Sequence, residues 1–367
     1  MKSKHYLHGG DLDGVARIYG INKEDIWDFS SNVNPLGISP VAKERLIQNI
    51  DCITTYPDVQ YIDLKEAVAA YCNVLSSHVL VGNGSTEIIS LFIHNHMPQN
   101  TLIIGPTYSE YERELNLIKS NITYYRLPEE DEFKLSFDDL INRVKEHLYD
   151  LVILCNPNNP TSTAIKTTDI KKLLLSFKEM NCFLMIDETY IEFCDDPQVF
   201  SAASLVREFD NLIVIRGISK FFSSPGLRFG YGLSSNKNIH DTFMHHKKPW
   251  SINSLAVIGV LAMLSDKDYI MKTHDFFTKE RKRILSLLLD LKSVKVYRPE
   301  ANFVLLKLQN SKLTSLDITQ KLMEDKMFIR DCSSFPFLDD QFIRFCFLSS
   351  SQNTALINKL AEIIGNF

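Results

Sequence analysis

The chain has 367 residues, 40 Lys and Arg against 45 Asp and Glu, a net charge of −5 and 45% hydrophobic residues. This composition excludes a disordered, collagen-like or low-complexity protein, and the length fits two domains or one large α/β body with an appendage. The mildly acidic balance leaves no broad basic surface, so we expect no nucleic-acid partner.

The first 30 residues indicate an arm with one short helix. Five β-rich runs then alternate with helix-like segments: HVLVG at 78–82, TLIIG at 101–105, LVILC at 151–155, CFLMID at 182–187 and LIVIR at 212–216. Strands that are apolar on both faces are typical of a buried parallel sheet. The sequence therefore predicts an α/β fold whose large domain has a mostly parallel sheet flanked by helices.

After Gly232 the pattern changes to long helices at roughly 252–265 and 273–291. Four strand-like runs follow: KVYRP, FVLLKL, MFIR and FIRFC. A helix is expected between the first and second runs, another between the second and third, and one at the end. We interpret this region as a smaller α/β C-terminal domain. The predicted division is an N-terminal arm with part of the small lobe at 1–50, a large domain at 51–250 and a small domain at 251–367.

The seven cysteines lack C-x-x-C spacing, and several lie in apolar runs. This is typical of reduced core residues in a cytoplasmic protein. The first ten residues have no apolar stretch, and the longest apolar run, near 255–264, is too short to cross a bilayer. We expect a cytoplasmic protein with no secretion signal and no membrane partner.

Functional groups in a parallel sheet gather where strands end and helices begin. After the first strand, Gly84, Ser85 and Thr86 open a helix whose free N–H groups suit a phosphate, although a Gly turn with a Ser N-cap explains them too. After the second strand, Tyr108 offers an aromatic face to a flat ring, with an ordinary core or surface Tyr as the alternative.

The next two strand ends carry amides and carboxylates. Asn159 belongs to CNPNNPTS, a turn signal that also supplies side-chain amide donors. Asp187 ends an apolar strand with Tyr190 just beyond, and a carboxylate buried there needs a cationic partner.

The fifth strand is followed by Ser219 and Lys220, with Arg228 further along a Gly/Pro loop; a solvated Lys is the ordinary alternative. Together these groups match the needs of pyridoxal phosphate: Lys220 would bind its aldehyde and Asp187 would keep its pyridine nitrogen protonated. Asn159 and Tyr190 would hold the phenolic oxygen. The expected phosphate ligands are Gly84, Ser85, Thr86, Ser219 and Arg228.

Seven motifs occur in a fixed order: YPD at 56–58, GNGSTE at 82–87, GPTY at 105–108, NPNNPT at 156–161, DETY at 187–190, SK at 219–220 and GLRFGY at 226–231. With them the chain resembles the fold-type I pyridoxal-phosphate enzymes of the class I/II aminotransferase group, from about residue 8 to the C-terminus. Within this group it resembles the histidinol-phosphate aminotransferases and the L-threonine O-3-phosphate decarboxylases of cobalamin biosynthesis.

Several stretches resemble the decarboxylases more: HGGD at 8–11, FSSNVNPLG at 29–37, DCITTYPD at 51–58, KPWSIN at 248–253 and IRDCSSFPFLDDQFIRF at 329–345. The resemblance implies these substrate contacts: His8, Gly9, Asn32, Asn159, Arg330 and Arg344. It also implies that Tyr56 reaches across a homodimer interface to the cofactor phosphate. Ser162 departs from the pattern, because many relatives have Gly after NPNNPT.

The residues themselves also favour a substrate with two anionic groups. Arg330 and Arg344 lie near predicted strand ends, and two guanidinium forks suit a phosphate and a carboxylate. The alternative is that each makes a surface ion pair worth under about 1 kcal/mol.

We therefore expect a carboxy-lyase that converts L-threonine O-3-phosphate to (R)-1-amino-2-propanol phosphate, with L-serine O-phosphate as a close variant substrate. The alternative activity is aminotransfer from histidinol phosphate to 2-oxoglutarate. A non-catalytic relative is disfavoured because Lys220, Asp187 and Arg228 are all present. His94-x-His96 lacks a third ligand nearby in sequence, so no metal is predicted. No G-x-G-x-x-G follows the first strand, so a dinucleotide site has no support.

Overall fold

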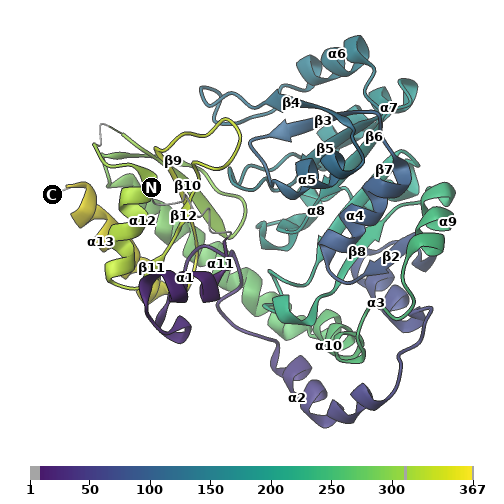
Figure 1. Ribbon diagram of the computed structural model, residues 1–367, viewed down its shortest axis with the longest axis horizontal. Helices are drawn as coiled ribbons and strands as arrows, with labels where there is room; N and C mark the ends of the chain where they lie inside the picture. Colours follow the sequence, from purple (N-terminus) through teal and green to yellow (C-terminus); the bar gives the residue numbers. More distant parts are fainter. Residues whose placement is uncertain (1–8, 310–311, 366–367) are drawn as a thin grey trace.

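A seven-stranded sheet forms the centre of the larger of two lobes (Figure 1). The computed structural model describes residues 9–309 and 312–365. The sheet strands are β2 (Val79–Gly82), β3 (Asn100–Gly105), β4 (Asn121–Arg126), β5 (Leu151–Cys155), β6 (Phe183–Asp187), β7 (Leu212–Gly217) and β8 (Gly230–Leu233). Their order is β2-β8-β7-β6-β5-β3-β4, and only β8 runs antiparallel to its neighbours.

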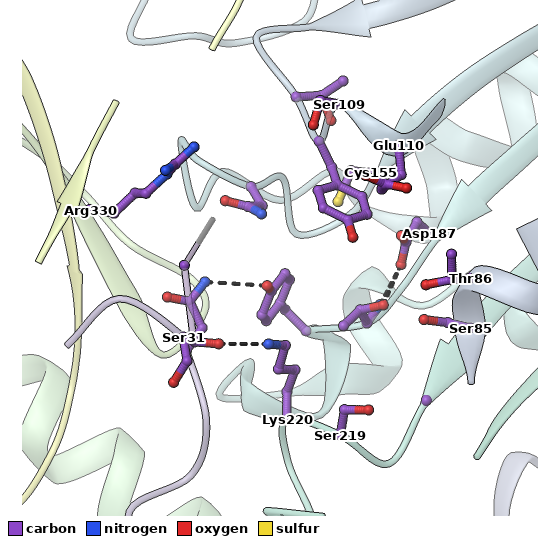
Figure 2. A pocket seen from close by; sticks show the side chains of 18 of the residues that line it. Ser31, Ser85, Thr86, Ser109, Glu110, Cys155, Asp187, Ser219, Lys220 and Arg330 are labelled. Atoms are coloured by element: carbon purple, nitrogen blue, oxygen red, sulfur yellow. Dashed lines mark hydrogen bonds between the residues drawn. The ribbon is translucent and has the colours of Figure 1, made fainter. Parts of the chain in front are cut away.

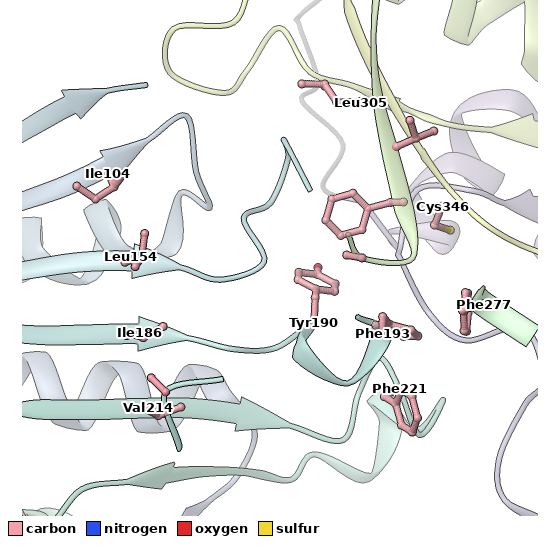
Figure 3. Packing of buried hydrophobic residues seen from close by; sticks show 14 of the residues in the cluster. Ile104, Leu154, Ile186, Tyr190, Phe193, Val214, Phe221, Phe277, Leu305 and Cys346 are labelled. Carbon is pink, nitrogen blue, oxygen red and sulfur yellow. The ribbon is translucent and has the colours of Figure 1, made fainter. Parts of the chain in front are cut away.

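Helices cover both faces of this sheet because its central strands are apolar on both sides. Ile103, Ile153 and Met185 pack with α4 (Ser85–His96), α5 (Glu110–Leu117) and α9 (Lys237–His246) on one face. The other face carries α3 (Ile62–Cys72), α6 (Phe137–His147), α7 (Thr167–Glu179) and α10 (Ser254–Ser265). On that face Figure 3 shows Ile104, Leu154, Ile186 and Val214 in a row across neighbouring strands, and the same core continues into the small lobe.

The smaller lobe contains an antiparallel sheet in the order β12-β13-β10-β9. Its strands are β9 (Val294–Tyr297), β10 (Phe303–Leu308), β12 (Arg330–Asp331) and β13 (Phe342–Cys346). A separate parallel pair joins β1 (Trp27–Asp28) to β11 (Met327–Phe328), so the N-terminal arm is part of this lobe. Its helices are α1 (Leu12–Tyr19), α12 (Ser315–Glu324) and α13 (Ser350–Ile364), and α11 (Lys267–Leu289) leads into it from the large lobe.

Shorter elements connect these parts. They are α2 (Pro40–Gln48), α8 (Pro197–Phe200) and the 3-10 turns Lys23–Asp25, Ile50–Thr54, Ser76–His78, Ile191–Phe193, Ala203–Arg207 and Pro225–Leu227. Within the described residues, no helix is both long and apolar enough to span a membrane.

The expected fold class and the five expected strands of the large sheet are confirmed. β4 and β8 were not predicted from the sequence. The helix expected between KVYRP and FVLLKL was also wrong, because residues 298–302 form a tight connection there. β9 and β10 consequently pair as an antiparallel hairpin. The run MFIR is divided between β11 and β12, which belong to different sheets. The domain limits at 50 and 250 stay a prediction, although α10 packs on α2 and α3.

Candidate active site

A cavity of about 400 Å³ lies between the two lobes, at the carboxyl edge of the large sheet. The large lobe supplies residues that follow β3, β5, β6 and β7, and the small lobe supplies residues from β12, β13 and the loop between them. The N-terminal arm closes one side with Gly9 and residues 30–32. A Cβ atom at Gly9 would lie 2.6 Å from the Ser30 carbonyl oxygen, so the arm passes too closely for a larger residue.

Lys220 lies just beyond β7 and points into this cavity (Figure 2). Its Nζ donates a hydrogen bond to the Ser31 carbonyl oxygen at 2.6 Å. Burial, with a smaller contribution from the positive charge of Arg344, lowers the pKa of Lys220 to about 8. About a tenth of this amine is therefore neutral, and so nucleophilic, at pH 7, far more than for an ordinary lysine.

Asp187 ends β6 and is 4% exposed. Its Oδ2 accepts a 2.7 Å hydrogen bond from the Tyr111 hydroxyl, and its Oδ1 accepts bonds from Thr189 N at 2.9 Å and Thr189 Oγ1 at 2.6 Å. Burial raises the pKa of Asp187, whereas these hydrogen bonds lower it. Within the described chain no Lys or Arg forms an ion pair with this carboxylate. The protonated ring nitrogen of pyridoxal phosphate would supply the missing positive charge.

The start of α4 has the features of an anion-binding site. Its N-cap residue Gly84 has φ 88° and no side-chain cap, so the first N–H groups of the helix have no capping partner. Ser85, Thr86, Ser219 and Arg228 line the adjoining cavity. A Cβ at Gly84 would collide with the Arg228 guanidinium. Free N–H groups, hydroxyls and a guanidinium at one helix N-terminus suit a phosphate group.

Tyr108, Tyr190 and Asn32 line another part of the cavity wall. Tyr108 lines the cavity, and its ring stands at 85° to that of Tyr111. Asn32 Nδ2 donates to the Tyr190 hydroxyl at 3.2 Å, while Asn32 Oδ1 is buried without a hydrogen-bond partner. An unpartnered buried acceptor at the wall of a cavity suits a ligand that carries a donor.

The two predicted arginines are neighbours. Arg330 in β12 is the register partner of Arg344 in β13, and both line the cavity. Arg344 is 3% exposed and donates to Asn159 Oδ1 and to the Ser30 carbonyl oxygen, while its Nε is buried without a partner. Arg330 donates to Ser334 Oγ at 2.7 Å.

The structure therefore brings together most of the predicted site residues. The exceptions are Gly84, which lies behind the cavity wall against Arg228, His8, which lies outside the described residues, and Tyr56. Tyr56 is 79% exposed, packs against Trp250 with ring centroids 4.7 Å apart and ring planes at 35°, and does not line the cavity of this chain. Its predicted role in a second subunit's site stays a prediction.

Sequence reasoning missed Tyr111, Thr189 and Ser334. Tyr111 follows Tyr108 by three residues in GPTYSEY and lies in the first turn of α5, so its place just after a strand end was the available signal. Ser162 adopts φ 60°, a left-handed conformation that favours Gly, and its hydroxyl accepts a hydrogen bond from Ala301 N at 2.9 Å. This residue thereby connects the two lobes.

The described residues contain no group of three or more His, Cys, Asp or Glu arranged to hold a metal. His94, weighed above as a ligand, has its Nε2 3.1 Å from Glu114 Oε2 instead.

The sequence matches the family described as aminotransferase class I and II over residues 24–360. It is 36% identical over 359 residues to a putative threonine-phosphate decarboxylase of Caldanaerobacter subterraneus subsp. tengcongensis, covering 98% of this chain and 94% of that protein. It is 31% identical to the threonine-phosphate decarboxylase of Salmonella typhimurium, covering 97% and 96%. The crystal structure of histidinol-phosphate aminotransferase from Clostridium acetobutylicum has a TM-score of 0.86 at 32% identity, covering 92% of this chain and 99% of that one.

Proposed function

The chain belongs to the aminotransferase class I and II family and is a pyridoxal-phosphate-dependent enzyme, and from this premise we propose that it decarboxylates L-threonine O-3-phosphate to (R)-1-amino-2-propanol phosphate. The relatives named as threonine-phosphate decarboxylases support the decarboxylation. In the proposal this reaction serves cobalamin biosynthesis. L-Serine O-phosphate is a second substrate, because one methyl group in a pocket changes binding by only about 1–3 kcal/mol.

The observation that carries the proposal is the pairing of Arg330 with Arg344 across two antiparallel strands. Two guanidinium groups that line one cavity suit a substrate with two anionic groups, such as a phosphate and a carboxylate. Arg344 is held by Asn159 and by the Ser30 carbonyl oxygen. Arg330 is held by Ser334, in the loop that follows β12. In the proposal, Arg344 binds the substrate carboxylate and Arg330 binds its phosphate.

The cofactor residues divide into four groups by the part of the cofactor that they would contact. Asp187 would pair with the ring nitrogen, Tyr108 would cover the ring, and Tyr190 with Asn159 would contact the phenolic oxygen. Ser85, Thr86, Ser219 and Arg228 would bind the cofactor phosphate. Pyridoxal phosphate, when bound, supplies an electron-withdrawing ring that lets one bond at the amino-acid α-carbon break.

Lys220 Nζ would hold the cofactor until the substrate amine takes its place, and its ammonium form would then donate a proton to the α-carbon from which CO2 has left. Its pKa of about 8 suits this role, because both the neutral and the protonated amine are populated near neutral pH. The two arginines select which bond at the α-carbon breaks, since a displacement of about 1 Å at a reacting centre has a large effect on rate.

The active form in the proposal is a homodimer. Large apolar side chains are exposed along residues 41–62 and at one later position: Val41, Ile47, Ile50, Ile53, Tyr56, Val59, Ile62 and Trp250. A short segment with so many exposed apolar side chains suits an interface, and a second copy of the chain would cover them.

The second candidate is histidinol-phosphate aminotransferase, because the Clostridium acetobutylicum enzyme of that name has the same fold at 32% identity. The two activities differ in their co-substrate. The test measures CO2 release from L-threonine O-3-phosphate in the absence of any keto acid. Release under these conditions supports the decarboxylase, and turnover that strictly requires 2-oxoglutarate contradicts it.

A further inference from the structure

The loop between β12 and β13, residues 332–341, begins at the proposed substrate phosphate site and reaches across to the large lobe. At its start, Arg330 donates to Ser334 Oγ and lies over the Phe335 ring at 5.4 Å. Ser334, Phe335 and Pro336 line the cavity, and Phe335 and Leu338 are buried. The first part of the loop is therefore held by contacts within the small lobe.

Phe337 provides the contact on the other side. Its ring meets Tyr124 edge to face, with centroids 5.5 Å apart at 81°, and Arg126 Cζ lies 5.7 Å from its centre. Gly105, at the end of β3, faces the same ring edge. All three partners belong to the β3–β4 edge of the large sheet, so this one side chain joins the two lobes at the mouth of the cavity.

The backbone at Phe337 indicates that the contact is specific. Its φ is 67°, a conformation that L-residues other than Gly rarely adopt, and the side chain is 42% exposed. Glycine at this position would remove the backbone strain and would expose little apolar surface to water. The position instead carries Phe, whose ring packs against the Tyr124 ring and the Arg126 guanidinium.

Tyr124 continues the connection into the active site. Its hydroxyl donates to Glu112 Oε2 at 3.0 Å, and Glu112 lies in the first turn of α5, directly after Tyr108 and Ser109. Phe337 therefore links the segment that carries Arg330 and Ser334 to the helix start next to Tyr108.

We propose that Phe337 is a positioning residue that fixes the 330–336 segment against the β3–β4 edge, so that Arg330 and Ser334 together receive the phosphate of the substrate. This inference rests on the proposed function for the identity of that substrate. Phe337 does not line the cavity and acts through Arg330 and Ser334.

The test compares three variants of the full-length, cofactor-loaded protein. Phe337→Ala removes the ring but keeps the Cβ atom and its backbone restriction, and Phe337→Tyr keeps the ring. Glu129→Gln is the matched control, because Glu129 Oε atoms accept from Tyr297 and Lys307 at 2.8 Å and thus join the lobes away from Arg330. The measurements are KM and kcat for L-threonine O-3-phosphate, cofactor affinity, and hydrogen exchange of residues 330–336.

Phe337→Ala should raise KM by about 10-fold or more while kcat stays within about twofold, because the substrate site loses its preorganisation and the reacting groups do not change. Cofactor affinity should be unchanged, exchange at 330–336 should increase, and Phe337→Tyr should restore both KM and protection. An unchanged KM in Phe337→Ala, or an equal rise in Glu129→Gln, overturns the proposal.

Failure of the proposed function has a different signature. If the unmodified enzyme releases no CO2, protection of 330–336 by inorganic phosphate becomes the readout. Phosphate protection that Phe337→Ala abolishes supports the positioning role without the decarboxylase. Protection that is equal in both proteins, or absent from both, overturns the positioning role as well.

Discussion

Replacing Tyr111 by Phe should shift the pH dependence of the enzyme through Asp187. The Tyr111 hydroxyl donates to Asp187 Oδ2 at 2.7 Å, both groups are buried, and burial has already raised the pKa of Asp187. A hydrogen bond to a charged acceptor contributes about 1.5–3 kcal/mol. One pKa unit corresponds to about 1.36 kcal/mol. Losing this bond should therefore raise the pKa of Asp187 by about 1–2 further units.

The sign follows from the form that the hydroxyl stabilises. Tyr111 donates to the carboxylate and so favours the ionised form; without it, Asp187 becomes neutral at a higher pH and no longer pairs with a protonated ring nitrogen. The acidic limbs of cofactor binding and of kcat/KM should both move up by about 1–2 pH units. Packing changes little, because Phe keeps the ring.

The assay follows the visible absorbance of bound cofactor and the rate of CO2 release as functions of pH. Tyr125→Phe is the matched control: the Tyr125 hydroxyl donates to Asp139 Oδ2, also at 2.7 Å, outside the residues that line the cavity. The control should leave both limbs in place. An acidic limb at the same pH in Tyr111→Phe and the unmodified enzyme would refute this reasoning.

Three further predictions concern charged groups of the site. Arg228→Gln should weaken cofactor binding by about 10-fold or more, measured by equilibrium titration, with little change in substrate KM. Arg344→Gln should raise substrate KM, measured from initial rates, with little change in cofactor binding. Equal effects of either variant on both constants would contradict the division of roles. Asp187→Asn should keep part of the cofactor affinity and slow turnover by about 100-fold, because a neutral ring nitrogen withdraws electrons poorly, and an unchanged kcat would be evidence against that pairing. In cofactor-free protein, capture of pyridoxal phosphate by Lys220 should accelerate as pH rises and level off above about 8, since the neutral amine reacts. A rate that keeps rising to the ordinary lysine pKa would show that Lys220 is unperturbed.

The parallel part of the large sheet could be predicted because its strands are apolar on both faces. β5 is buried at every position, so it appears in the sequence as an uninterrupted run. β4 was missed because it is an edge strand with a mixture of buried and exposed residues. β8, with the sequence GYGL, is short and rich in Gly, because a Cβ at Gly230 would collide with Ser85 N. The need for that space is visible only once α4 has been placed beside it.

The site residues that follow strands could be found from their positions because parallel strands bring their ends together. Contacts between distant segments could not. Lys220 donates to a backbone carbonyl of Ser31, 189 positions away, and main-chain atoms carry no sequence signal. The pairing of Arg330 with Arg344 likewise depends on the register of two strands, which short runs of apolar residues do not specify.

The most direct test of the account is borohydride reduction of the cofactor-loaded protein followed by peptide mapping. The account predicts a single pyridoxyl label on the peptide that contains Lys220, and none after Lys220→Ala. A label on another lysine, or equal labelling of the variant, would contradict the assignment on which the proposed chemistry depends.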